Sequence, residues 1–517
     1  MRKIFLLLIL FALTGIMFGQ SLAIDNFIRS YDQSKLAAID SLLTTLNLEE
    51  GFDGNVLIAD KGHIIYERSL GYANAETKTH LTINTIFNLA SVSKIFTAVA
   101  TMKLVEQGKL KLTDDIQQYF PDLPYQKITI YNLLTHTSGI EDYFADPVRN
   151  VLGKKASNTE IEKKYAAVHL NIKFLPDSNW SYSNTNFLFL ALIIEKVSGM
   201  TYPDFVQKYI FIPAKMYQSF VLEENAPPAL KEKITSLYYF ADYLSVHPVN
   251  VDSIPFTKMY YSIVGGSYGD GGIFSTTGDL YKFHEALQKG NILNIKSLNL
   301  MYASTKLPNG KDYEAGNANS DYNSNYGLGW IVAKDSSIGK IVWHSGSNPG
   351  TLTFFMRNID KDQCVIVLNN NWYRGTYHLG GSLMNIINNR PVQLLAPSLA
   401  RKIGQEYSLY GADAALKLLD SLKAGKEYHI GFMEMNELGY DLLKRNDTQF
   451  AIEIFKVNTE QYPSSGDVWD SLAEAYYKAG DKKTAIKYYE KSLILNPNNE
   501  GGKTMLKKIK DEVNKSK

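Results

Sequence analysis

Ser91 and Lys94 stand three residues apart in the stretch from Phe87 to Ala98. On a helix this spacing places a hydroxyl and an amine on one face, where they can act as nucleophile and base. The apolar and small residues that follow predict a buried helix ending near Gly108. Ser91 would then lie in its first turn, where backbone N–H groups stabilise developing negative charge.

A lone Ser-x-x-Lys pattern is weak evidence, because Ser337 and Lys340 repeat it. The second copy contains Gly339 and precedes the strand-like run 341–343, so it lacks a helical apolar stripe. The ordinary explanation of any single copy is a solvated helix start. Partners elsewhere in the chain must therefore decide whether Ser91 is catalytic.

A tyrosine and an asparagine, Tyr182 and Asn184, precede an apolar helix for which Gly199 is the predicted stop. A tyrosine in this setting can relay a proton if a nearby lysine favours its ionised form. The asparagine can hold that lysine and a substrate carbonyl. Tyr72 and Asn74 have the same spacing but follow a predicted hairpin instead of opening a helix. Taken alone, Tyr182 has packing or capping as its ordinary explanation.

The third candidate element is the run from His344 through Gly346 to Ser347, at the end of the predicted strand 341–343. A strand edge ending in small residues lets a substrate lie alongside it. The backbone N–H of Ser347 could then share an oxyanion with that of Ser91. A satisfied surface histidine is the alternative for His344 if the other two elements are absent.

The chain begins with Arg2, Lys3 and an apolar run over residues 4–18, followed by a Ser-x-Ala cleavage candidate. This pattern predicts a signal peptide over residues 1–23 and a periplasmic or secreted protein, with an uncleaved anchor as the alternative. The 54 basic and 53 acidic residues nearly cancel, which argues against nucleic acid or anionic membrane as a partner. We expect no membrane span after signal cleavage, and a packing role for the single cysteine, Cys364.

Strand signals occur at both ends of the region 24–395, with helical signals between them. Residues 55–59 and 63–67 flank a turn and predict a hairpin. Further strands are expected at 329–332, 341–343, 351–355 and 364–368. We therefore predict one α+β domain over 24–395, in which an antiparallel sheet flanked by helices lies beside a helical lobe.

Residues 396–430 are expected to form a helical linker, and residues 431–517 contain a repeat with a 34-residue offset. That period is typical of tetratricopeptide helix pairs. The first copy could also be two generic amphipathic helices. Because fewer than three repeats are marginal alone, we expect them to pack on a helix over 412–422. The matching pairs include Leu438 and Leu472, Asp447 and Asp481, Ala451 and Ala485, and Pro463 and Pro497.

In order, Ser91-x-x-Lys94, Tyr182-x-Asn184 and His344-x-Gly346 resemble the three motifs of the serine β-lactamase and penicillin-binding-protein superfamily. The tyrosine is similar to that of class C β-lactamases, D-Ala-D-Ala carboxypeptidases, D-aminopeptidases and related esterases. Residues 133–139, 271–276 and 326–330 strengthen the resemblance, which spans about residues 51–371. The resemblance implies a β-lactamase/transpeptidase-like fold.

The resemblance also implies a role for each motif residue. Ser91 would be the acylated nucleophile and Lys94 its activating partner. Tyr182 would be the general base for acylation and would help to activate water for deacylation. Asn184 would position Lys94 and the substrate, and the N–H groups of Ser91 and Ser347 would form the oxyanion hole. No metal or organic cofactor is implied.

One departure concerns the third motif, where class C β-lactamases carry Lys-Thr-Gly and this chain has His344, Ser345 and Gly346. A lysine is a permanent cation that attracts a carboxylate, whereas an unperturbed histidine is mostly neutral at neutral pH. The change puts antibiotic hydrolysis in doubt and favours an esterase or peptidase.

The sequence thus predicts a secreted or periplasmic serine hydrolase that cleaves an ester or amide through an acyl-enzyme. A peptide, D-amino-acid or cell-wall-related molecule would be its substrate, and a protein partner is expected through the repeats. The alternative is a non-enzymatic module that binds cell-wall fragments or proteins. Substrate choice would depend on the loops 141–173 and 221–267, which are rich in tyrosine.

Overall fold

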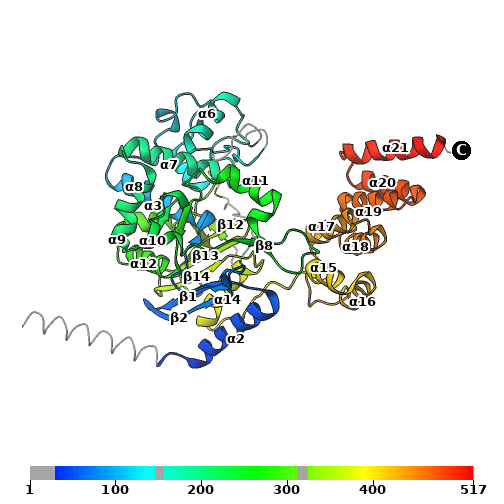
Figure 1. Ribbon diagram of the computed structural model, residues 1–517. Helices are drawn as coiled ribbons and strands as arrows, with labels where there is room; N and C mark the ends of the chain where they lie inside the picture. The colour runs from blue at the N-terminus through cyan, green and yellow to red at the C-terminus, as the bar shows by residue number, and fades with distance from the viewer. Residues whose placement is uncertain (1–29, 146–148, 150–155, 309, 311–323, 516–517) are drawn as a thin grey trace, which may run out of the picture. The chain divides into compact units, whose positions relative to one another are not determined.

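The computed structural model describes residues 30–145, 149, 156–308, 310 and 324–515 (Figure 1). The chain divides into two compact units. The first comprises Met1–Tyr238 and Asn250–Leu394, and the second comprises Tyr239–Val249 and Leu395–Lys517. The predicted signal peptide, residues 1–23, lies outside the described residues.

A seven-stranded antiparallel sheet, joined from chain-distant parts, forms the centre of the first unit (Figure 1). The predicted hairpin at residues 55–67 occupies one edge. In spatial order the strands are β10 (Ser324–Tyr326), β11 (Ile331–Ala333), β12 (Ile341–Asn348), β13 (Thr351–Asn358), β14 (Gln363–Asn369), β1 (Gly54–Asp60) and β2 (His63–Leu70).

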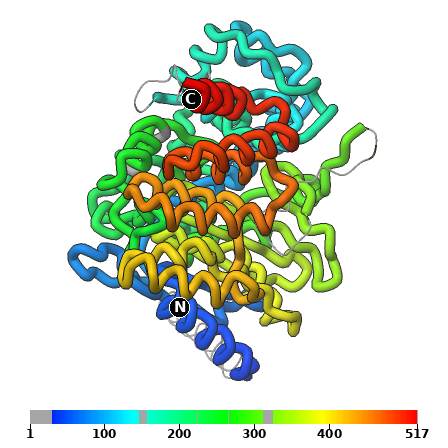
Figure 2. The backbone as a smooth tube through the Cα atoms, turned by 90° about the vertical axis from the view of Figure 1, so that its right-hand side faces the viewer, coloured from blue at the N-terminus to red at the C-terminus, as the bar shows by residue number. Residues whose placement is uncertain are grey.

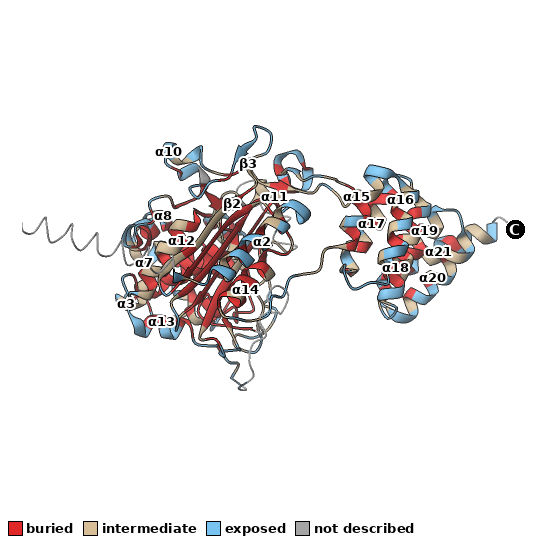
Figure 3. Cartoon of the chain, turned by 90° about the horizontal axis from the view of Figure 1, so that it is seen from below, coloured by how far each residue is buried: buried red, intermediate tan, exposed pale blue. Residues whose placement is uncertain are grey.

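Helices cover both faces of this sheet, and the central strands β13, β14 and β1 bury the side chains of both faces (Figure 3). On β14, Val365 and Val367 face a core shared with α2 (Gln33–Glu50) and α14 (Thr376–Ile387). The alternate residues Cys364, Ile366 and Leu368 face a larger core on the other side. That second core includes α3 (Ser93–Glu106), α7 (Asn184–Ser198) and α12 (Thr277–Gln288). Because both faces of β14 are covered, its residues from Cys364 to Leu368 are all apolar.

A helical lobe and a small sheet complete the first unit. The small sheet has the order β5 (Phe87–Asn88), β9 (Ile273–Ser275) and β6 (Phe220–Val221). The predicted α+β class, an antiparallel sheet with helices and a helical lobe, is confirmed. The lobe and its surroundings contain α4 (Ile130–Thr135), α6 (Asn158–Val168), α8 (Tyr202–Val206), α9 (Ile212–Ala214), α10 (Pro228–Lys231), α11 (Pro255–Val264) and α13 (Ile295–Met301).

The second unit is helical, and its helices follow one another side by side in chain order (Figures 1 and 2). As expected, the helix at 412–422 shares a core with the helices that follow it. The helices are α15 (Leu399–Tyr410), α16 (Ala412–Leu422), α17 (Phe432–Lys444), α18 (Thr448–Gln461), α19 (Gly466–Lys478), α20 (Lys482–Leu495) and α21 (Glu500–Lys515).

The 34-residue repeat is visible in equivalent helix caps. The Asp447 carboxylate accepts the Phe450 backbone N–H at the start of α18, and the Asp481 carboxylate accepts that of Thr484 at the start of α20. An aspartate at this position satisfies one of the free N–H groups of a helix start. The repeated cap therefore reproduces the same helix boundary in both pairs.

The segment Tyr239–Val249 belongs to this helical unit although the sequence of the first unit continues on both sides of it. Leu244 is buried in the core with α15 to α18. The Arg401 guanidinium lies over the Phe240 ring at 3.9 Å and the Tyr243 ring at 4.6 Å. The Asp441 carboxylate accepts the Tyr243 backbone N–H at 2.9 Å. Sequence periodicity gave no sign of this insertion.

Within the described part of the chain, we find no helix with both the length and the apolar content needed to cross a membrane.

Candidate active site

Ser91 lies in a short 3₁₀ turn, Ala90–Val92, between strand β5 and helix α3. The sequence placed it in the first turn of the α-helix itself, which instead begins at Ser93. The difference is small because the turn leads directly into the helix. Ser91 thus stands at the N-terminal end of a buried helix, as the proposed chemistry requires.

The backbone around Ser91 is held in an unusual conformation. Ala90, which precedes it, has a φ of 47°, a left-handed value that costs energy for a residue with a side chain. The Asn88 side chain accepts the Ala90 N–H at 2.8 Å. The Ser93 hydroxyl accepts the Ile273 N–H at 3.1 Å and so ties the helix start to β9. These contacts fix the direction in which Ser91 leaves the chain.

Lys94 is fully buried one helical turn after Ser91. Its Nζ donates to Ser91 Oγ at 3.1 Å, to Asn184 Oδ1 at 2.7 Å and to the Asp270 backbone oxygen at 2.7 Å. Three acceptors use the full donor capacity of an ammonium group. The structure therefore brings together the predicted serine, lysine and asparagine.

Burial lowers the pKa of Lys94 to about 8, although the carboxylates of Asp270 and Asp142 oppose the shift. An ordinary lysine stays charged at neutral pH and cannot accept a proton. With a pKa near 8, roughly a tenth of the Lys94 amines are neutral at pH 7. A useful fraction of Lys94 is thus neutral and able to accept a proton near neutral pH.

Asn184 is the first residue of α7, and a carboxylate orients its amide. Asp142 Oδ2 accepts the Asn184 backbone N–H at 2.8 Å and its Nδ2 at 2.9 Å. Because Nδ2 binds Asp142, Oδ1 is left to accept from Lys94. Asp142 therefore caps the helix and sets which end of the Asn184 amide meets the lysine.

Tyr182 precedes α7, and Lys94 Nζ lies 4.9 Å from the centroid of its ring. The ring also packs on His136, with centroids 4.4 Å apart. Burial raises the pKa of Tyr182 well above its usual value, and a hydrogen bond with Ser91 opposes this shift only in part. In this environment Tyr182 keeps its phenolic proton at neutral pH.

His344 lies on β12 and is buried, with 2% of its surface exposed. Its Nδ1 is 2.7 Å from the Ser345 backbone oxygen, and its Nε2 is 3.0 Å from the Tyr326 hydroxyl. A carbonyl only accepts, so Nδ1 carries the proton and Nε2 accepts from Tyr326. Burial, and then the charge of Lys94, lower the pKa of His344 to about 3. The third motif therefore supplies no cation at neutral pH.

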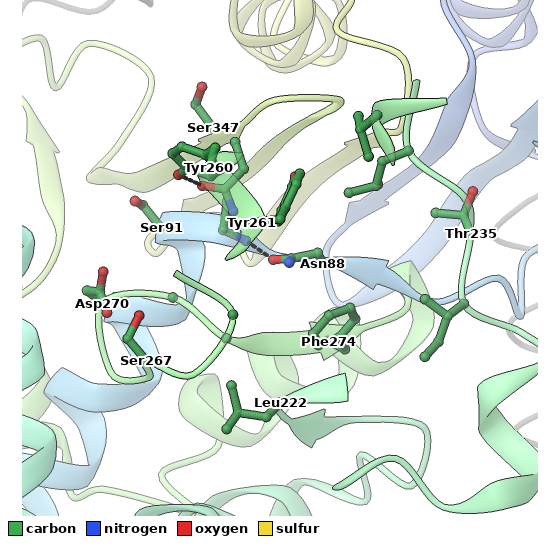
Figure 4. Close-up of a pocket in the computed structure, with 18 of the residues that line it drawn as sticks. Asn88, Ser91, Leu222, Thr235, Tyr260, Tyr261, Ser267, Asp270, Phe274 and Ser347 are labelled. Carbon is green, nitrogen blue, oxygen red and sulfur yellow. Dashed lines mark hydrogen bonds between the residues drawn. The ribbon is translucent and has the colours of Figure 1, made fainter. Parts of the chain in front are cut away.

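Gly346 brings strand β12 against the turn that carries Ser91. A Cβ on Gly346 would lie 2.3 Å from the Leu89 backbone oxygen, 2.3 Å from Thr353 Oγ1 and 3.0 Å from Ser91 N. Only glycine permits this approach. The next residue, Ser347, is exposed and lines the cavity beside Ser91 (Figure 4).

A cavity of about 730 Å³ opens at Ser91. Part of its wall is aromatic, because Phe144 and Tyr260 stack with ring centroids 5.6 Å apart. Tyr143 and Tyr261 also line it. Only some aromatic residues of the loops 141–173 and 221–267 line the cavity. Tyr239, Phe240 and Tyr243 belong to the second unit.

Sequence reasoning missed several groups of the site. Asp142 and Asp270 surround Lys94 but come from loops without a recognisable spacing. His136 lies in the run 133–139, which had been noted without a role, and it contacts Tyr182. Ser337, the serine of the second Ser-x-x-Lys copy, is exposed in a turn before β12 and takes no part in the site.

A serine at a helix start, a buried lysine with a lowered pKa and a cavity beside them define a serine hydrolase of the Ser-x-x-Lys type. Comparison with known families agrees with this class. Residues 41–381 match the Beta-lactamase family, and residues 466–499 match the Tetratricopeptide repeat. The chain belongs to the beta-lactamase family and is an enzyme of that family.

Individual relatives support the assignment. Penicillin-binding protein 4* of Bacillus subtilis is 36% identical over 339 residues, covering 65% of this chain and 72% of the relative. A putative D-alanyl-D-alanine carboxypeptidase of Salmonella gallinarum is 26% identical, covering 60% of this chain and 74% of the relative. The octameric penicillin-binding protein homologue from Pyrococcus abyssi superposes with a TM-score of 0.57 at 25% identity, covering 69% of this chain and 78% of the other.

Proposed function

We propose that this protein hydrolyses an amide or ester bond in a peptide of the D-amino-acid or cell-wall type, through an acyl-enzyme on Ser91. The observation that carries the proposal is the contact between Ser91 Oγ and the Lys94 amine, whose pKa is lowered to about 8. A buried amine with this pKa can accept the serine proton near neutral pH.

The names of the relatives support the substrate type. One is a penicillin-binding protein and another a putative D-alanyl-D-alanine carboxypeptidase. Such substrates lie outside the cytoplasm, which agrees with the signal peptide expected over residues 1–23. We therefore propose that the enzyme works in the periplasm or is secreted.

In the proposed acylation step, the neutral Lys94 amine takes the proton of Ser91 Oγ while that oxygen attacks the substrate carbonyl carbon. The carbonyl oxygen becomes an oxyanion, which the backbone N–H groups of Ser91 and Ser347 stabilise. Asn184 holds Lys94 in place through its Oδ1. The carbonyl then re-forms as the bond to the leaving group breaks.

The leaving amine or alcohol needs a proton. We propose that Tyr182 relays it, since its ring centroid lies 4.9 Å from Lys94 Nζ and its hydroxyl hydrogen-bonds with Ser91. The step proposed here makes Lys94 the general base, whereas the resemblance implied that role for Tyr182. Its raised pKa favours a neutral hydroxyl that passes the proton from Lys94 to the leaving group. Water then attacks the carbonyl carbon of the acyl-enzyme while Lys94 accepts its proton. The ester bond to Ser91 breaks, the acid is released, and Ser91 Oγ takes that proton back.

The neutral state of His344 supports the preference for an ester or peptide over a β-lactam. A substrate carboxylate beside the third motif would meet an uncharged imidazole instead of a lysine cation. Binding through that carboxylate would therefore be weak. The sequence had put β-lactam hydrolysis in doubt for the same reason, the absence of a lysine in the third motif.

Labelling with a fluorophosphonate tests the proposal, because the reagent phosphonylates an activated serine. We expect mass spectrometry to find one adduct on Ser91, none after Ser91→Ala, and full labelling after Ser337→Ala. The last variant is a matched control, since Ser337 belongs to the second Ser-x-x-Lys copy and lies in an exposed turn. A folded protein that acquires no adduct on Ser91 would refute the proposal.

The tetratricopeptide match supports a protein partner, which such repeats typically bind. We keep this partner as a prediction. Chemical cross-linking of the full chain in intact cells, followed by mass spectrometry, tests it. Links confined to this chain would count against it.

A further inference from the structure

Asp270 is a buried acidic residue near the nucleophile. Its side chain is buried, with 6% of the residue exposed, and the residue lines the cavity. Figure 4 shows Asp270 and Ser267 on the same side of the cavity as Ser91. Lys94 Nζ links Ser91 to Asp270, because it donates both to Ser91 Oγ and to the Asp270 backbone oxygen.

The two carboxylate oxygens of Asp270 differ in their hydrogen bonding. Oδ2 accepts the Tyr143 hydroxyl at 2.9 Å, and that hydroxyl is also 3.3 Å from Ser267 Oγ. Oδ1 is buried and has no hydrogen-bond partner among the described residues. A buried acceptor without a partner carries a desolvation cost, which a ligand that donates to it would remove. The lysine does not fill this role, because it binds the Asp270 main chain.

The charges around the cavity favour a cationic ligand. Among the described residues that line it, Glu224, Asp252 and Asp270 are acidic, and only Lys231 is basic. His344, on the strand beside the cavity, is neutral. The acidic side chains of this lining outnumber the basic one, so they favour a positively charged group over a carboxylate.

We propose that Asp270 binds the ammonium group of the substrate, so that the preferred acyl donor carries a free amino group near the scissile carbonyl. This inference rests on the proposed hydrolase function and specifies its substrate class. The ammonium would donate to Asp270 Oδ1. The side chain of the same amino acid would meet the aromatic wall of Phe144 and Tyr260. An N-acylated substrate has no charge to place there and would leave Oδ1 unpaired.

The kinetic test compares alanine p-nitroanilide with its N-acetyl derivative, using the faster enantiomer of each. We expect the wild-type protein to favour the free amine, and Asp270→Asn to reduce the ratio of the two kcat/KM values by about 10- to 100-fold. Asp252→Asn is the matched control, because it removes an exposed acid of the same cavity; its ratio should change less than about threefold. An equal loss on both substrates in Asp270→Asn would mean that Asp270 only supports Lys94, and would overturn the inference.

A binding measurement separates this inference from the hydrolase proposal. Calorimetry on Ser91→Ala needs no turnover and compares alaninamide with N-acetylalaninamide. We expect the free amine to bind at least about tenfold more tightly, and this preference to disappear when Asp270→Asn is added. Equal binding of both amides would refute the ammonium site even if Ser91 is labelled. A clear preference would support the site even if the labelling fails.

Discussion

Replacement of Gly346 by alanine tests whether the approach of β12 to the Ser91 turn sets the geometry of the site. The added Cβ would lie 2.3 Å from the Leu89 oxygen and 2.3 Å from Thr353 Oγ1. Ordinary contact begins near 3.4 Å. The strand and the turn must therefore separate by roughly 1 Å, since the Leu89 oxygen belongs to the main chain and cannot rotate away.

Such a displacement moves the Ser347 N–H relative to that of Ser91, and the proposed oxyanion hole needs both. A misplacement of about 1 Å costs roughly 100-fold in rate. Overpacking also lowers the free energy of unfolding by about 1 to 3 kcal/mol. We therefore expect Gly346→Ala to lower kcat/KM for p-nitrophenyl acetate by about 100-fold, with the protein still folded.

Gly54→Ala is the control for a general loss of stability. Its Cβ would meet the Leu368 backbone oxygen at 2.4 Å, in the same sheet, but Gly54 does not line the cavity. Thermal unfolding should show similar losses for both variants, while Gly54→Ala keeps its activity within about threefold. A folded Gly346→Ala variant with near wild-type kcat/KM would refute the account of the oxyanion hole. Equal losses of activity in both variants would refute it as well.

Two further predictions concern proton transfer. Because only the neutral amine of Lys94 accepts a proton, kcat/KM should rise with pH through an apparent pKa of about 8; a flat profile between about pH 6 and 9 would contradict this. Tyr182→Phe should slow anilide hydrolysis by about 100-fold but ester hydrolysis much less, since p-nitrophenolate leaves without a proton. Steady-state kinetics on both substrates would decide, and equal losses would argue against a proton relay.

The chemistry of the site was predictable where it depends on short spacings. Ser91 and Lys94 lie three residues apart where a 3₁₀ turn leads into α3, and Tyr182 and Asn184 flank the start of α7, so their patterns are local. Asp142 and Asp270 were not predictable, because loops bring them to Lys94 from positions far along the chain. No periodicity or motif marks such residues.

Burial was the second quantity that the sequence could not provide. His344 was expected to be mostly neutral from its ordinary pKa alone, and the structure gives a stronger reason, since desolvation lowers that pKa to about 3. The pKa of Lys94 likewise depends on complete burial. The strand at residues 364–368 and the 34-residue repeat were predictable, because a short apolar run and a fixed period can both be read along the chain. The recruitment of residues 239–249 to the helical unit follows no regular pattern.

That recruitment has a consequence for how the protein is made. The Ser408 hydroxyl donates to the Leu244 backbone oxygen, a partner 164 residues earlier in the chain. During synthesis, Leu244 leaves the ribosome long before the helices that bury it. The helical unit thus completes its core late, by closing a long loop onto a segment already in place. A fragment beginning at Leu395 would lack Leu244 and so part of its own core. Cutting the chain at that boundary would therefore split one folding unit into two pieces.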